Sequence, residues 1–267
     1  MKVEDYIATR QVEKPKGCPC EKPVALMLTY KRPGLLLGAV ESFLKTADGI
    51  PLHVFDDGSE DGVKDVELNC VEEYGVKVHV MLHRGFALSW LNMLKLVKET
   101  MKDYDSVVML EDDIVFAKGW LDVLVRMQKG INELGMKQGM TTCFRPHERP
   151  QSAIVDLQGV KAYQSMAHTF HANMMPMEIL DRMDVLEQSV DEAVKSKMGH
   201  GIDVYWVGNL AHRLNRVSFI SEQSWVAHVG IKRSLVEAQG FGPCRHSGVN
   251  LVKELEEYDM MKNCPVV

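Results

Sequence analysis

Three consecutive carboxylates, Glu111, Asp112 and Asp113, follow a short apolar stretch at residues 107–110. Adjacent negative charges repel one another unless a cation neutralises them, and hard divalent ions such as Mg²⁺ and Mn²⁺ prefer carboxylates together with substrate phosphate oxygens. A solvated acidic turn that caps the next helix is the alternative interpretation. We predict a divalent-metal site at this cluster.

The element before the cluster indicates where such a site lies. Residues 107–110 read Val-Val-Met-Leu, a pattern typical of a strand that is buried on both faces of a parallel sheet. Open α/β sheets bind ligands at the carboxyl ends of their strands. The acidic cluster is therefore expected at the ligand-binding edge of a sheet.

Strand and helix patterns alternate through the first half of the chain. Further buried-strand patterns cover residues 24–29, 52–55 and 76–82. Helical spacing of apolar residues follows Pro33, Ser59 and Leu88. This alternation predicts a doubly wound α/β fold, with a mostly parallel sheet flanked by helices.

The second half of the chain is less regular. Trp120 opens an amphipathic helix, and strands and loops mix through residues 141–174. Pro176 suits the first turn of a helix, and a further helix is expected over residues 181–197. The turn that follows places Asp203 ahead of an aromatic run.

Composition is that of a globular chain, with 46% hydrophobic and 25% charged residues among 267. The net charge of −6 argues against a surface that binds nucleic acid on all sides. We expect no membrane segment, because the apolar runs fall well below the ~18 residues that span a bilayer. With no apolar signal-peptide core, a cytoplasmic location is expected, in the host cytoplasm if the chain is viral.

The six cysteines are expected as reduced thiols rather than a disulfide framework. A zinc site that joins the two ends of the chain is disfavoured, because its ligand spacing fits no standard zinc finger. The sequence leaves open the roles of Cys18, Cys20, Cys244 and Cys264.

Polar residues follow three of the predicted strands, in segments 28–33, 53–59 and 111–113. Their order and spacing resemble the GT-A glycosyltransferases, in particular family two and related enzymes. Glu111-Asp112-Asp113 resembles the D-x-D metal motif of these enzymes in an E-D-D form, and Arg84 lies in a segment that resembles one bordering the nucleotide. The resemblance covers residues 24–125.

The resemblance implies a metal-dependent glycosyltransferase that moves a sugar from a nucleotide-diphosphate donor, most commonly a UDP-sugar, to a hydroxyl acceptor. A divalent ion, Mn²⁺ or Mg²⁺, would neutralise the diphosphate leaving group. Asp113 is the expected metal ligand. Asp112 and Glu111 would bind the ribose, the sugar or the water shell of the ion.

The same resemblance implies contacts with the donor and a division of the chain. Asp56 or Asp57 would accept a hydrogen bond from the base, although a turn and helix N-cap explains these residues as well. The base and phosphates would be flanked by Thr29, Tyr30, Lys31, Arg32 and Arg84. After a polar arm at residues 1–22, residues 23–115 would bind the nucleotide-sugar, and residues 116–267 would form the acceptor-binding and catalytic half of the same domain.

An inverting transferase needs a catalytic base, because the acceptor hydroxyl loses a proton as it attacks. Asp203 stands where many inverting members carry an acidic residue at the start of a helix, and an ordinary helix cap is the alternative. Asp191 and Glu192 are weaker candidates, because they lie mid-helix among other charges and are expected to face solvent.

His228 resembles the late histidine that completes metal or diphosphate binding in several GT-A branches, and Lys232 and Arg233 follow it as phosphate partners. A structural histidine is the alternative. The context of His168, His171 and His200 indicates no comparable role.

The acceptor could be a glycan, a lipid-linked sugar, a protein, a small molecule or a hydroxylated DNA base. The last would need a basic groove, for which the arginines and lysines between Arg213 and Arg245 are the candidate. Two other function classes stay open: a nucleotidyltransferase, and a non-catalytic module that binds carbohydrate or nucleotide. A dinucleotide-dependent dehydrogenase is disfavoured, because no G-x-G-x-x-G follows a predicted strand. The sequence does not indicate an oligomeric state.

Overall fold

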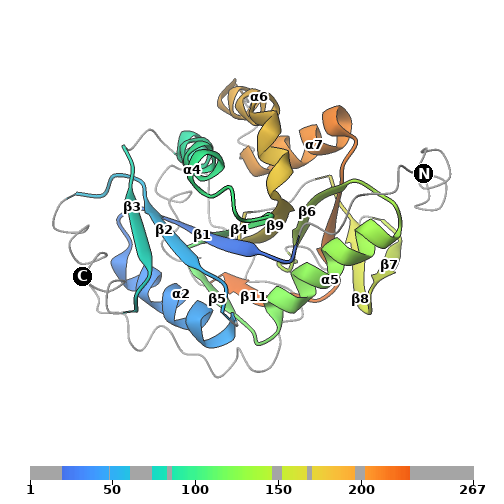
Figure 1. The fold of residues 1–267 in the computed structure, drawn as a ribbon, viewed down its shortest axis with the longest axis horizontal. Helices are drawn as coiled ribbons and strands as arrows, with labels where there is room; N and C mark the ends of the chain where they lie inside the picture. The colour runs from blue at the N-terminus through green and yellow to red at the C-terminus, as the bar shows by residue number, and fades with distance from the viewer. Residues whose placement is uncertain are drawn as a thin grey trace.

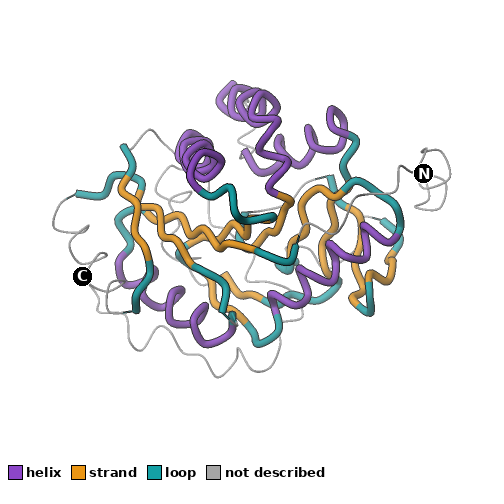
Figure 2. The backbone as a smooth tube through the Cα atoms, in the orientation of Figure 1, coloured by secondary structure: helices purple, strands orange, loops and turns teal. Residues whose placement is uncertain are grey.

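The computed structural model describes residues 20–47, 49–60, 74–82, 86–145, 152–166, 170–195 and 202–228. Within these residues, a nine-stranded sheet carries helices on both faces, and a two-stranded ribbon lies beside it (Figure 1). Figure 2 shows the strands as one orange layer between purple helices. The strand order across the sheet is β3-β2-β1-β4-β9-β6-β10-β8-β7.

The first four strands in this order are parallel. They are β3 (Lys77–Val80), β2 (Leu52–Asp56), β1 (Pro23–Thr29) and β4 (Ser106–Glu111). β1 lies between β2 and β4, so its carboxyl end is flanked by theirs. Leu28 pairs with both Phe55 and Glu111, which aligns the polar residues that follow the three strands.

The remaining strands are mixed in direction. β9 (Ala172–Pro176) runs antiparallel between β4 and β6 (Gln138–Thr142), and β10 (Val217–Ser221) runs parallel to β6. The sheet ends with the antiparallel strands β8 (Val160–Gln164) and β7 (Ile154–Leu157). Because β9 is antiparallel to β4, the start of β9 lies at the edge where β4 ends.

Two hydrophobic cores fill the spaces between sheet and helices. α2 (Pro33–Thr46) and α5 (Trp120–Glu133) cover one face, while α4 (Phe86–Thr100), α6 (Met183–Lys195) and α7 (Ile202–Leu214) cover the other (Figure 1). Successive side chains of β1 enter the two cores in turn. Ala25 and Met27 belong to the first core, and Leu26 and Leu28 belong to the second. The period of two in a strand therefore divides one apolar segment between both layers.

The small ribbon pairs β5 (Ile114–Phe116) with β11 (Val226–His228) in antiparallel register. Helix α2 fixes its position, since the hydroxyl of Ser42 accepts a hydrogen bond from the backbone N–H of Phe116 at 2.9 Å. His228 pairs with Ile114, the residue directly after the acidic cluster. This pairing brings the end of the described chain to the ligand-binding edge.

The predicted α/β fold class is confirmed, and the strands expected at residues 24–29, 52–55, 76–82 and 107–110 correspond to β1 to β4. Pro176 ends β9 opposite Ser106 and is the N-cap of the 3-10 helix Met177–Arg182, so it stands one position before the helical turn in which it was expected. The helix expected after Ser59 lies outside the described residues. In the described part of the chain, every helix is too short or too polar to cross a membrane.

Candidate functional site

Arg32 lies between the carboxylates of Asp112 and Asp113. Its Nη1 donates to Oδ2 of Asp113 at 2.7 Å, and its Nη2 forms an ion pair with Oδ1 of Asp112. Both carboxylates are almost fully buried. The cation that the acidic cluster requires is thus supplied, in part, by the chain itself, three residues after the end of β1.

Thr29, the last residue of β1, also contacts Asp112. Its hydroxyl donates a hydrogen bond to Oδ2 of Asp112 at 2.7 Å, in a buried setting. Register explains the contact, because β1 and β4 are adjacent and parallel and both end at this edge. Thr29 and Arg32 thus both contact the carboxylates, and their expected contacts with base and phosphates stay predictions.

The two aspartates share one guanidinium and ionise differently. Burial raises the pKa of Asp112 to about 7, and the Arg32 charge opposes that rise. Burial would also raise the pKa of Asp113, but Arg32 and His228 outweigh it and hold this pKa below its usual range. Burial lowers the pKa of Arg32, but the carboxylates outweigh it and leave the pKa above its ordinary value. Asp113 is thus the carboxylate held in its charged form.

His228 contacts Asp113 from the ribbon. The two atoms involved, Nε2 of His228 and Oδ2 of Asp113, are 3.1 Å apart, and both side chains are buried. The pairing of His228 with Ile114 places the histidine there. The predicted role of His228 in metal or diphosphate binding stays a prediction.

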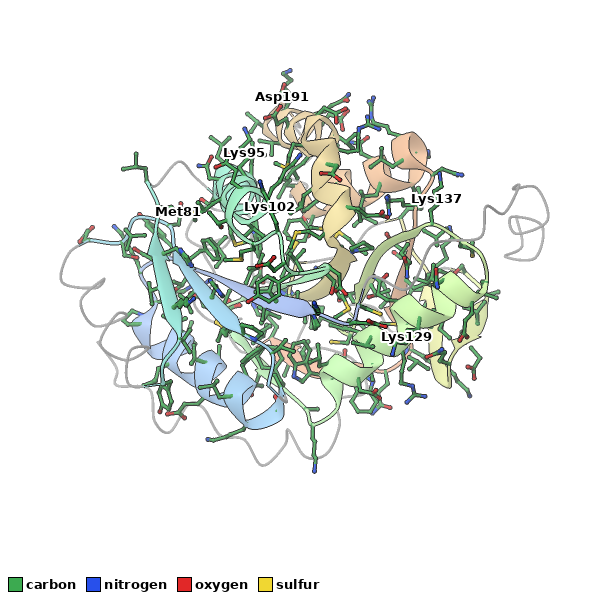
Figure 3. The ribbon with its side chains drawn as sticks, viewed as in Figure 1. Met81, Lys95, Lys102, Lys129, Lys137 and Asp191 are labelled. Atoms are coloured by element: carbon green, nitrogen blue, oxygen red, sulfur yellow. The ribbon has the colours of Figure 1, made fainter. Side chains whose placement is uncertain are left out.

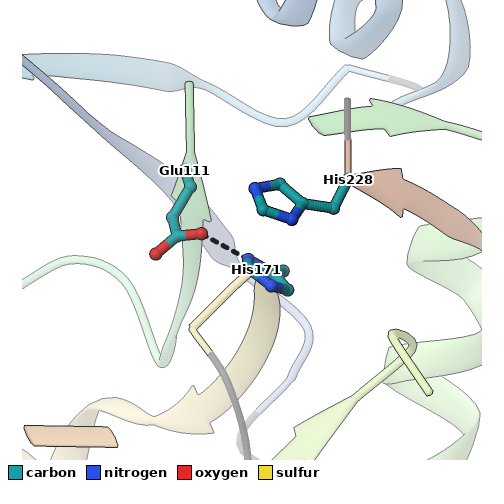
Figure 4. Close-up of side chains that lie close together, drawn as sticks. All are labelled: Glu111, His171 and His228. Carbon is teal, nitrogen blue, oxygen red and sulfur yellow. Dashed lines mark hydrogen bonds and ion pairs between the residues drawn. The ribbon is translucent and has the colours of Figure 1, made fainter. Parts of the chain in front are cut away.

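A second cluster combines Glu111, His171 and His228 (Figure 4). One potential ligand atom from each side chain lies within 4.8 Å of the other two. Nδ1 of His171 contacts Oε2 of Glu111, and the ring of His171 stacks on that of His228 with centroids 4.4 Å apart. Three strands, β4, β9 and β11, thus bring their ends together at this point.

These donors fit a divalent metal ion. One carboxylate and two imidazoles are common ligands of first-row transition metals. In addition, Oδ1 of Asp113 is buried and has no hydrogen-bond partner among the described residues. A buried carboxylate oxygen without a donor is costly, and a cation or a substrate hydroxyl would satisfy it.

Asp203 is the second residue of α7 and is close enough to Glu111 and His171 for their charges to act on it. Burial, aided by the negative charge of Glu111, raises its pKa to about 6, while backbone N–H groups and His171 act in the opposite direction. A carboxylate with a pKa close to neutrality suits a general base. Its position at the start of a helix agrees with the sequence prediction, and its catalytic role stays a prediction.

The end of β2 supports the turn interpretation for Asp56. Its carboxylate accepts hydrogen bonds from the backbone N–H and the hydroxyl of Ser59, the pattern of a local turn. Asp57 is buried beside it, and its backbone N–H donates to the carbonyl oxygen of Thr29 at 2.9 Å. A role for either in base recognition stays a prediction.

Other predicted site residues lie farther from the clusters or are not described. Lys31 forms an exposed ion pair with Glu60, and its ammonium group lies 5.2 Å from the ring centroid of Tyr30. Outside the described residues lie Arg84, Lys232, Arg233, His168 and His200. Of the cysteines with open roles, only Cys20 is described, and it is buried.

Charged residues on α6 and α7 are engaged in ion pairs. Asp191 is exposed at the outer surface of α6, as expected (Figure 3), and Glu192 pairs with Arg213. Arg216 donates to Glu178 at 2.9 Å and to the carbonyl oxygen of Gln138. These contacts weaken the basic-groove hypothesis at Arg213 and Arg216. The rest of that region lies outside the described residues.

His171 is the site residue that sequence reasoning missed. It stands directly before β9, and no local sequence pattern marks it as a candidate ligand. Recognising its role requires the antiparallel pairing of Leu110 with Ala172, which places His171 opposite Glu111.

Similar folds occur among solved structures. GalNAc-T7, solved with UDP, GalNAc and Mn²⁺, gives a TM-score of 0.50 at 11% identity over 78% of this chain and 43% of that chain. The mannosyltransferase PcManGT from Pyrobaculum calidifontis, in complex with GDP-Man and Mn²⁺, gives a TM-score of 0.44 at 15% identity. The match covers 74% of this chain and 58% of that chain. The galactosyltransferase LgtC, in complex with donor and acceptor sugar analogs, gives 0.44 at 15% identity over 69% of each chain.

The likeness to GalNAc-T7 identifies the fold as that of the GT-A glycosyltransferases, as the sequence predicted. The chain spans less than two thirds of the length of PcManGT and of GalNAc-T7. No protein-family profile matches the sequence, and no curated protein is detectably similar to it in sequence.

Proposed function

We propose that this protein is a metal-dependent glycosyltransferase that takes a sugar from a nucleotide-diphosphate donor, preferably a UDP-sugar, and transfers it to a hydroxyl acceptor with inversion. One observation carries the proposal. Asp203 at the start of α7 is close enough to Glu111 and His171 for their charges to act on it, and these residues stand at the carboxyl edge of the sheet, beside the contact between His228 and Asp113.

The donor would bind across the carboxyl ends of β2, β1 and β4. Asp57 directly follows β2 and would recognise the base, while Glu111 ends β4 and Asp113 follows it two residues later. A divalent ion bound at the acidic cluster would neutralise the diphosphate as it leaves. UDP is supported by the family resemblance and by the UDP with which GalNAc-T7 was solved, whereas PcManGT was solved with GDP-Man.

Asp203 would accept the proton of the attacking hydroxyl. Its raised pKa, about 6, leaves it mostly ionised at neutral pH and still basic enough to take a proton. A base that deprotonates the acceptor is what an inverting reaction requires, and the candidacy of Asp203 for that role supports inversion. The acceptor class stays open among glycans, proteins, small molecules and modified DNA bases.

A direct test is a transfer assay with UDP-sugars and a panel of acceptors, comparing native protein with Asp203→Asn. We expect transfer by the native protein, a product of inverted anomeric configuration by NMR, and a loss of roughly 100-fold or more in the variant with donor affinity unchanged. A retained anomeric configuration, or transfer by the variant within about tenfold of native, would contradict the assignment of Asp203.

A non-catalytic nucleotide-binding module on the same fold is the second candidate. It is favoured by the internal neutralisation of the acidic pair, because Arg32 makes the cluster stable without substrate. Binding of a nucleotide-sugar with neither transfer nor hydrolysis across the acceptor panel would support that module.

A further inference from the structure

Two different sets of side chains meet at His228. On one side, Nε2 of His228 lies 3.1 Å from Oδ2 of Asp113. On the other side, its ring stacks on His171, which in turn contacts Glu111. His228 could therefore bind a metal ion together with Asp113, or together with His171 and Glu111. In the first case Asp113 is a metal ligand, and in the second it orients His228.

The hydrogen bond to Asp113 decides which nitrogen carries the proton. Asp113 already accepts a charge-assisted hydrogen bond from Arg32, so its carboxylate is an acceptor. Nε2 of His228 must then donate to it, and in a neutral imidazole this leaves the lone pair on Nδ1. Histidines that bind metals commonly donate their other ring N–H to a carboxylate, which fixes the tautomer and the orientation of the ring.

We propose that Glu111, His171 and His228 are the direct ligands of the divalent ion, and that Asp113 is a positioning residue that acts through His228. This inference deepens the proposed function and rests on it. It assigns His171, which neither sequence pattern nor family resemblance singles out, to the metal centre. It also replaces Asp113 as the expected ligand.

The positions of the three donors support this ligand set. Metal–ligand distances of about 2.0–2.2 Å place two ligands of one ion roughly 3–4 Å apart, and one potential ligand atom of each residue lies within 4.8 Å of the other two. Asp113 does not belong to this convergent group. Its atom Oδ1 would be an acceptor for a water of the ion's shell.

The environment holds the imidazoles in place. His171 and His228 are 7% and 5% exposed, and the ring of Phe144 meets His171 edge-on with centroids 4.3 Å apart. The stacked pair has little room to rotate away. Such pre-positioning is typical of a binding site rather than of surface histidines.

The donor set predicts which ions bind. Mg²⁺ prefers six oxygen ligands, whereas imidazole nitrogen suits transition metals. We therefore expect Mn²⁺ to bind more tightly than Mg²⁺, and Co²⁺ and Zn²⁺ more tightly than Mn²⁺ in the order common to N/O sites.

The test is calorimetric titration of the full-length, metal-free protein with MnCl₂ alone, comparing four variants with the native protein. His171→Gln and Glu111→Gln should weaken Mn²⁺ binding by more than about 100-fold, and Asp113→Asn by about 10- to 100-fold, as for residues that act through a ligand. His212→Gln, an exposed histidine on α7, is the matched control and should bind like the native protein. Mn²⁺ affinity of His171→Gln within about threefold of native would overturn the proposal, as would a native protein that does not bind Mn²⁺.

A second measurement avoids variants that fail to fold. Pulsed EPR of the Mn²⁺-loaded native protein detects nitrogen nuclei bonded to the ion, and we expect two imidazole nitrogens. One nitrogen or none would overturn the proposal. Failure of this inference can be distinguished from failure of the proposed function. If UDP and metal bind equally well to the native protein and to His171→Gln, the proposed transferase function stands and this ligand set is rejected.

Discussion

The guanidinium of Arg32 donates to Asp113 at 2.7 Å and forms an ion pair with Asp112 at the same time. Two adjacent carboxylates can be buried at the end of β4 because this cation, placed just after β1, offsets their repulsion. The acidic motif is thereby linked to the fold of the chain.

Replacing Arg32 should destabilise the fold strongly. Arg32→Met leaves two buried carboxylates without their partner, and breaking a buried ion pair costs roughly 3 kcal/mol or more. The midpoint of urea unfolding at pH 7.5 measures the loss. Lys31→Met is the matched control, because the ion pair of Lys31 is with the exposed Glu60, and its midpoint should stay near native. Equal midpoints for both variants would contradict the ion-pair account.

Metal removal should abolish transfer and leave the protein folded. Arg32 neutralises the acidic pair in the absence of an ion, so chelation exposes no uncompensated pair of charges. Circular dichroism and transfer rates, measured with EDTA and after Mn²⁺ is restored, give both readouts. Unfolding upon chelation would show that the ion, rather than Arg32, maintains the structure.

Transfer should depend on pH through Asp203. The base must be deprotonated, so kcat/KM is expected to rise with pH and level off above the pKa of about 6. Below that pKa the rate should fall about tenfold per pH unit. A rate that is flat between pH 5 and pH 8 would argue against this residue as the base.

The Asp203→Asn variant should also be more stable at neutral pH. The pKa of Asp203 in the folded protein, about 6, lies above its ordinary value of 3.8. Protonated Asp203 therefore favours the folded state, and this contribution to stability is lost as pH rises from about 4 to 6. Removing the charge should add roughly 1–2 kcal/mol at pH 7.5, after allowance for partial exposure, and nothing near pH 4. Unfolding midpoints at both pH values test this, and a variant less stable than native at pH 7.5 contradicts it.

Two glycines test the packing that positions the site. A Cβ on Gly130 of α5 would lie 2.8 Å from Leu157 of β7, so Gly130→Ala should cost about 1–3 kcal/mol. On α7, a Cβ on Gly208 would meet only the carbonyl oxygen of Met166 at 3.9 Å, so Gly208→Ala should add about 0.5–1 kcal/mol. Thermal unfolding compares them, and the opposite order would contradict the packing of α5 on the sheet.

The parallel half of the fold could be predicted from sequence because its signals are local. Apolar runs such as residues 107–110 and the polar residues after them identify strands and their carboxyl ends without knowledge of pairing. Asp113 and Asp203 could be chosen as candidate site residues for the same reason. Asp113 follows a recognisable strand, and Asp203 stands at the start of a recognisable helix.

The rest depends on contacts between distant segments. His171 reaches Glu111 only because β9 inserts antiparallel between β4 and β6, and no local pattern encodes that insertion. Sequence alone indicates phosphates as partners for Arg32, because its charge fits them. Its carboxylate partners follow from the side-by-side placement of β1 and β4, together with the burial that makes an unpaired charge costly.

The most direct test of the central claim is calorimetric binding of UDP, GDP, CDP and dTDP, with and without Mn²⁺, to the native protein and to Asp113→Asn. We predict that UDP binds in the presence of Mn²⁺, and that binding is lost or weakened roughly tenfold or more without the ion and in the variant. Failure of all four nucleotides to bind the folded native protein with Mn²⁺ would contradict a metal-dependent glycosyltransferase.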